Sequence, residues 1–102
     1  MNTLYRVLSQ NKESISLELS DKSHPIFKAH FPKSPLLPGF VMIDMIAEVL
    51  GDDIVSIKYS KFIKSIFPCD RLMCKIQKDD KTRMIKIFRD EAKVSEIMYD
   101  AR

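Results

Sequence analysis

The hydrophobic pattern of the chain is mostly an alternation, which one continuous apolar run interrupts near the middle. Residues 40–50 read FVMIDMIAEVL, in which only Asp44 and Glu48 are polar. The Pro-Gly pair at 38–39 is typical of a helix start, and Gly51 is typical of a helix end. Because a membrane span needs about 20 apolar residues, this shorter run predicts a helix in the centre of a core.

Most of the remaining chain alternates between apolar and polar residues, which is typical of half-buried strands. The clearest example is residues 14–20, SISLELS, whereas residues 4–8 fit a short strand or a helical turn equally well. The other predicted strands are residues 55–60, 72–77, 83–89 and 94–99. A hairpin turn is predicted at residues 79–81, between the second and third of these. The pattern therefore predicts a single α+β domain, residues 1–102, in which an antiparallel sheet wraps around one central helix.

Composition narrows the setting of this domain. Seventeen basic and fourteen acidic residues give a net charge of +3, which is too weak a basic balance to indicate nucleic-acid binding. The chain carries no signal-peptide pattern and no membrane-length run, so we expect a cytoplasmic protein without a membrane span. Cys69 and Cys74 are too few for a disulfide framework and have no histidine at metal-ligand spacing. We expect no metal or cofactor, and read both cysteines as small core or turn residues.

The two acidic residues of the predicted helix are the first candidates for chemistry. Asp44 and Glu48 lie four positions apart and therefore share one helix face. A buried carboxylate is costly unless something pairs with it, and His30, a short loop upstream, is the candidate partner. A buried histidine–carboxylate pair is a common basis for acid/base chemistry at neutral pH. The simpler alternatives are a structural histidine and an exposed aspartate.

The segment around His30 resembles the signature of a known enzyme family. Residues 29–39, AHFPKSPLLPG, are similar to the G-H-F-P-x-x-P-x-x-P-G motif of bacterial 3-hydroxyacyl-acyl-carrier-protein dehydratases of the FabZ and FabA types. Residues 24–32 and 62–70, HPIFKAHFP and FIKSIFPCD, resemble two further segments of that family. The resemblance runs in order from residue 13 to residue 100. It implies the hotdog fold, an antiparallel sheet around one central helix, in agreement with the hydrophobic pattern.

The resemblance also implies a reaction, the dehydration of 3-hydroxyacyl thioesters to trans-2-enoyl thioesters. His30 would remove the C2 proton as the general base. Asp44, supplied across a dimer interface in this family, would help to protonate the C3 oxygen as it leaves. Backbone N–H groups at the helix start, especially at Gly39, would stabilise the charge that develops on the thioester oxygen. Gly39 and Phe40 are therefore expected to contact the substrate.

The same resemblance implies partners. The substrate would arrive as a 3-hydroxyacyl chain on an acyl carrier protein, and the chain would form a homodimer or a larger assembly of dimers. A small sheet also leaves edges that a second copy could cover. Because carrier proteins of such systems are acidic, Lys61 and Lys64 are docking candidates, although such lysines are more often part of a solvated surface.

The chain departs from its relatives at several positions. Asp44 matches the FabA choice of carboxylate, but Glu48 stands where the family has glutamine. We expect the two like charges to repel and to share a proton, which would make Glu48 a modulator of the site. The alternative is that Glu48 points to solvent or to a lysine and has no role. The segment between the helix and Phe62 is shorter than in FabZ, as in short dehydratases of specialised pathways such as aryl polyene synthesis, and three family glycines are replaced, by Ala29, Lys33 and Cys69.

Three function classes follow from these observations. The first is a carrier-dependent dehydratase, the second is a hotdog acyl thioesterase, and the third is a non-catalytic subunit that binds an acyl carrier or an active paralogue. The spacing of the histidine, prolines and glycine in the motif argues against the thioesterase. The presence of both His30 and Asp44 argues against the non-catalytic subunit. Fold alone does not decide between the three.

Overall fold

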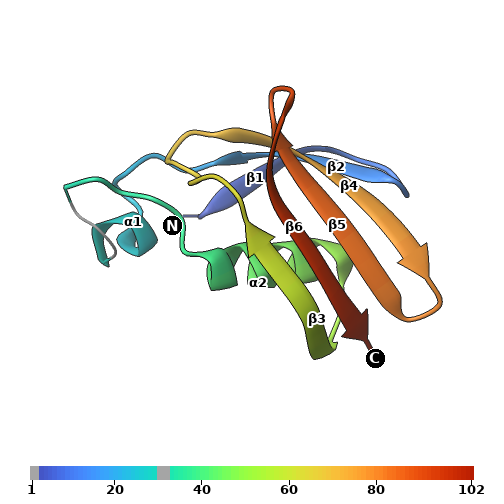
Figure 1. Cartoon of the computed structure of the whole chain (residues 1–102). Helices are drawn as coiled ribbons and strands as arrows, with labels where there is room; N and C mark the ends of the chain where they lie inside the picture. The colour runs from blue at the N-terminus through green and yellow to red at the C-terminus, as the bar shows by residue number, and fades with distance from the viewer. Residues whose placement is uncertain (1–2, 30–32) are drawn as a thin grey trace.

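The computed structural model describes residues 3–29 and 33–102 (Figure 1). Within them, six strands form one antiparallel sheet in the order β1-β2-β4-β5-β6-β3, and α2 lies across one face of that sheet. The elements are, in chain order, β1 (Tyr5–Gln10), β2 (Ser14–Leu19), α1 (Pro25–Ala29), α2 (Gly39–Leu50), β3 (Ile54–Phe62), β4 (Arg71–Asp79), β5 (Thr82–Arg89) and β6 (Ala92–Ala101). The predicted α+β class and the sheet wrapped around one main helix are confirmed.

Helix α2 begins and ends where the sequence predicts. It starts at Gly39 and is closed by Gly51, whose left-handed backbone (φ 70°) lets its N–H and the next one bond back to the last turn. One side of the helix is buried against the sheet, through Val41, Met42, Ile43, Met45, Ile46 and Ala47. The prediction that the helix is buried all round is wrong, because Asp44 and Glu48 are exposed. The helix is therefore amphipathic, and its polar face consists of these two residues.

The inner face of the sheet supplies the other half of the core. Buried residues of the four central strands form one hydrophobic cluster with the buried side of α2: Ile15, Leu17, Leu19, Leu72, Cys74, Ile76, Ile85, Ile87, Val94, Ile97 and Tyr99. The predicted strands and the turn at 79–81 are confirmed, and the ambiguous segment 4–8 belongs to strand β1. With β1, the sheet has six strands, and α1 is a short helix that the pattern did not indicate.

Strand β3 forms one edge of the sheet and differs from its sequence pattern. Its alternation predicted a half-buried strand, but Val55 and Ile57 are 60% and 50% exposed. Two register shifts against β6, at Ile54/Ser56 and Ile57/Tyr59, interrupt the period-two alternation. Within the described chain β3 pairs only with β6, so its apolar side chains remain uncovered at an open edge.

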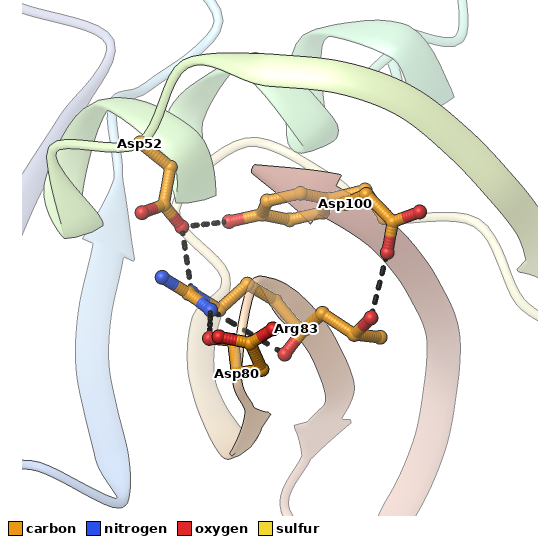
Figure 2. A network of polar contacts seen from close by, with 6 residues as sticks. Asp52, Asp80, Arg83 and Asp100 are labelled. Atoms are coloured by element: carbon orange, nitrogen blue, oxygen red, sulfur yellow. Dashed lines mark hydrogen bonds and ion pairs between the residues drawn. The ribbon is translucent and has the colours of Figure 1, made fainter. Parts of the chain in front are cut away.

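A polar cluster fastens the end of α2 to the sheet (Figure 2). The Asp52 carboxylate, just beyond the helix, accepts hydrogen bonds from the Tyr99 hydroxyl at 2.7 Å and from Arg83 Nε at 3.2 Å. The Asp52 and Arg83 side chains are only 9% and 14% exposed, and Arg83 also donates to the Asp80 carbonyl at 2.8 Å. Burial, together with the Asp52 carboxylate, raises the pKa of Tyr99 well above its usual range, so its hydroxyl stays a donor.

A second polar cluster ties the edge strand β3 to β6. The Glu96 carboxylate accepts from Lys93 Nζ at 2.7 Å and from the Tyr59 hydroxyl at 2.6 Å. These two hydrogen bonds lower the pKa of Glu96 to about 2, and the bond from Lys93 has the larger effect. The charged form of Glu96 is therefore the form that the folded state favours.

We expect Tyr99→Phe to lower the free energy of unfolding by about 2 kcal/mol, because the charged and nearly buried Asp52 carboxylate loses the hydrogen bond that the Tyr99 hydroxyl donates. The ring keeps its packing, so the fold should persist. Denaturant unfolding measures the change. Tyr59→Phe is the matched control, since it removes a tyrosine–carboxylate bond whose tyrosine is only half-buried, whereas Tyr99 is fully buried, and it should cost less. Equal losses in the two variants would contradict the special position given to Asp52.

The Glu96 cluster predicts an acid effect on stability. Because folding lowers the pKa of Glu96 from 4.5 to about 2, its contribution is complete above pH 4.5 and is lost as the pH falls toward 2. The thermal midpoint of the wild type should therefore fall more steeply over that window than the midpoint of Glu96→Gln. Glu91→Gln, in the exposed β5–β6 turn, should follow the wild type. Parallel curves for wild type and Glu96→Gln would refute the assignment.

Candidate active site

In the chain, the signature motif follows α1, which is anchored in the core, and leads into α2. Phe27 of α1 is fully buried in the core, and His24 Nδ1 accepts the Ile26 N–H at 3.0 Å, which caps the start of α1. His30 itself lies outside the described residues, so its predicted pairing with Asp44 stays a prediction. The chain enters the motif from Ala29, two residues beyond Phe27.

The exposed face of α2 and strand β1 enclose an open cavity of about 460 Å³. Leu4, Val7, Val41 and Met45 give it apolar walls, and Asp44 and Glu48 both line it. The structure thus brings the two predicted acidic residues into one space, as their spacing indicated. A carboxylate beside an apolar cavity can exchange protons with a ligand whose chain packs on the walls.

Glu48 has a partner that neither sequence interpretation named. The hydroxyl of Tyr5, the first residue of β1, donates a hydrogen bond to Glu48 Oε1. Burial raises the pKa of Tyr5 to about 12, and the hydrogen bond to Glu48 and its negative charge act in the same direction. The phenol is therefore protonated at neutral pH and remains a donor. Sequence reasoning missed Tyr5 because it lies in the ambiguous segment 4–8 and meets Glu48 from 43 residues away.

The start of α2 explains the motif glycine. A side-chain carbon at Gly39 would lie under 3.0 Å from the ring of Phe62, the last residue of β3. Within this chain, the close approach at Gly39 is made by Phe62, and the expected contact of Gly39 with a substrate stays a prediction. A second cavity of about 350 Å³ opens at this point, with Leu36, Met42 and Ile63 on its walls. Its position beside the helix start suits a ligand that reaches the first turn of α2.

The remaining candidate residues lie on the surface. Phe40 is 62% exposed. Lys64 lines the cavity beside Gly39, which keeps it a docking candidate. Lys61 lies in β3 opposite Glu96, and its Nζ is 5.5 Å from the centre of the Tyr59 ring. Lys61 and Lys64 are both exposed, so each could meet an acidic partner.

The cysteines occupy the places that the sequence indicated. Cys74 is fully buried in β4, and burial raises its pKa to about 12. Cys69 is exposed in a turn with a left-handed backbone (φ 66°), the conformation that glycine adopts most readily. Over residues 3–29 and 33–102, no cluster of three His, Cys, Asp or Glu side chains is arranged to hold a metal ion. None of the helices described there is long and apolar enough to cross a membrane.

The antiparallel sheet wrapped around α2 is the hotdog fold, the class that the sequence resemblance implied. The chain belongs to the ApeI-like dehydratase family, whose model, described as ApeI dehydratase, matches residues 7–98. The resemblance to dehydratases is therefore confirmed at the level of the family.

Comparison with solved structures supports the same assignment. A chain of the dehydratase heterocomplex ApeI:P from Xenorhabdus doucetiae superposes with a TM-score of 0.76 and 25% identity, over 99% of this chain and 98% of that one. An uncharacterized protein from Erwinia carotovora subsp. atroseptica shares the fold, with a TM-score of 0.61 and 22% identity, over 98% of this chain and 93% of that one.

Curated relatives are longer enzymes. The 3-hydroxyacyl-[acyl-carrier-protein] dehydratase FabZ of Paramagnetospirillum magneticum is 26% identical over 103 aligned residues, which cover 86% of this chain and 64% of the relative. FabZ of Xanthomonas euvesicatoria pv. vesicatoria is 31% identical over 87 residues, 71% of this chain and 57% of the relative. The chain thus spans only 57% to 64% of the length of these two relatives.

Proposed function

We propose that this protein dehydrates 3-hydroxyacyl thioesters, carried by an acyl carrier protein, to trans-2-enoyl thioesters. The observation that carries the proposal is the place of Asp44, exposed on α2 at an open cavity with apolar walls. Membership of the ApeI-like dehydratase family and the FabZ relatives supply the reaction class. The cavity walls suit an acyl chain, and the carboxyl suits a proton transfer to a leaving hydroxyl.

In the proposed reaction His30 takes the C2 proton, and the electron pair of that C–H bond becomes the C2–C3 double bond. The C3–O bond breaks, and Asp44, directly or through water, gives the leaving oxygen the proton that completes a water molecule. The backbone N–H of Gly39, at the first position of α2, would stabilise the charge on the thioester oxygen. Phe40, beside it, would contact the substrate near the thioester.

The proposed site takes His30 from one chain and Asp44 from another, in a homodimer or in a larger assembly of dimers. Strand β3 supports this arrangement, because it is an edge strand that leaves Val55, Ile57 and Phe62 at least half exposed. Pairing with the same strand of a second copy would cover both the open edge and these apolar side chains. The acidic carrier protein would dock near Lys61 and Lys64, and we place the reaction in the cytoplasm.

A second candidate function is that of one subunit in a dehydratase made of two different chains. The structurally similar protein from Xenorhabdus doucetiae is described as a dehydratase heterocomplex, and the exposed β3 edge would serve a related chain as well as an identical one. Dehydration by the purified chain alone favours the first candidate. Activity that appears only when a related hotdog chain is added favours the second.

We expect His30→Ala to lower kcat by at least about 100-fold, the usual contribution of a general base. Mass spectrometry of the carrier-bound product, with 3-hydroxyacyl substrates of several lengths, measures the loss. His24→Asn is the matched control, because asparagine can still cap α1, and it should keep wild-type turnover. Wild-type turnover in a folded His30→Ala protein would remove His30 from the mechanism.

Mixed dimers test whether the site is shared between chains. Differently tagged His30→Ala and Asp44→Ala chains, expressed together and purified through both tags, should form dimers with one intact site of two. Such dimers should show about half of the wild-type activity, since a two-fold symmetric dimer has two equivalent sites. Each variant alone should be inactive. Inactive mixed dimers, shown by light scattering to be dimers, would place both residues in the same chain.

A further inference from the structure

Tyr5 connects an edge strand to the acidic face of α2. It is paired with Leu19 of β2, a buried residue of the inner face, so its side chain is directed toward the helix. Its ring packs against the hydrophobic core, while its hydroxyl reaches the Glu48 carboxylate. The contact therefore combines a fixed ring with a polar end at the cavity that Asp44 also lines.

The acidic face has no cationic partner in the described part of the chain. The six ion pairs found there involve neither Asp44 nor Glu48. Arg6, the neighbour of Tyr5, faces the other side of the sheet and pairs with Glu18 at 2.7 Å. Two carboxylates four residues apart on a helix repel, so a neutral donor to one of them is the stabilising contact that the structure provides.

We infer that Tyr5 is a positioning residue of this site: its hydroxyl holds the Glu48 carboxylate toward β1 and leaves Asp44 as the carboxyl that serves the substrate. The inference rests on the proposed dehydration. A glutamine at position 48, the residue that the sequence resemblance implies for the family, would carry no charge to be held away from Asp44. The pairing of a glutamate with a tyrosine donor thus compensates for a departure of this chain from its family.

The test is a double-mutant cycle between the two residues. Tyr5→Phe keeps the ring and removes the donor, and we expect it to lower kcat about tenfold, or about 1.4 kcal/mol, with KM unchanged. In a Glu48→Gln background the same substitution should change kcat by less than about twofold, because no charge remains to be positioned. Tyr59→Phe, which removes another tyrosine–glutamate bond, should leave kcat unchanged.

Either of two kinetic results would overturn the inference. One is an unchanged kcat in Tyr5→Phe, and the other is an equal loss in the presence and absence of Glu48. A signal independent of activity separates this inference from the proposed function. In ¹³C-labelled protein at pH 7, the carboxyl resonance of Glu48 should move on Tyr5→Phe, whereas that of the exposed Glu91 should not. If the Glu48 resonance does not move in an enzyme that is active, the role of Tyr5 is refuted and the proposed dehydration is not. A wild type that dehydrates no carrier-bound substrate overturns the function, and with it the role of Tyr5.

Discussion

The burial of one side of α2 against the inner face of the sheet is the interaction on which the rest of the structure depends. A single helix of 12 residues covers the face of a six-stranded sheet, so nearly all of its apolar side chains are needed for packing. The two charged residues of the helix, Asp44 and Glu48, lie on its exposed side, at the cavity beside β1. The place of Asp44 and Glu48 is thus a direct result of how the core is filled.

Hydrophobic packing has no direction, so it does not by itself set the position of a helix along its axis. Here, specific contacts at the two ends of α2 fix its position along the axis. The Asp52 carboxylate holds the C-terminal end through Tyr99 and Arg83, and Gly39 leaves room for Phe62 at the N-terminal end. The geometry of the site is therefore set by residues that lie mostly outside the signature motif.

The hydrophobic period was sufficient to locate α2 and most of the strands, because an apolar face is written directly into the spacing of residues. It could not show whether the chain covers that face itself, which is why Val55 and Ile57 were expected to be half-buried and are exposed. The contact of Tyr5 with Glu48 depends on the tertiary fold and has no local pattern. His30 was identified by its motif alone, and its role stays a prediction.

The strand order has a consequence for the way this chain folds. Strands β4, β5 and β6 follow one another through two-residue turns, so their pairing needs only short loops to close and should form first. Strand β3 precedes them in the chain but joins the far edge of the sheet beside β6. During synthesis on the ribosome, α2 and β3 emerge after β1 and β2 but before β4, β5 and β6. Part of the apolar side of α2 therefore stays unburied until the last third of this chain is made, and a nascent chain with exposed apolar surface is prone to aggregate.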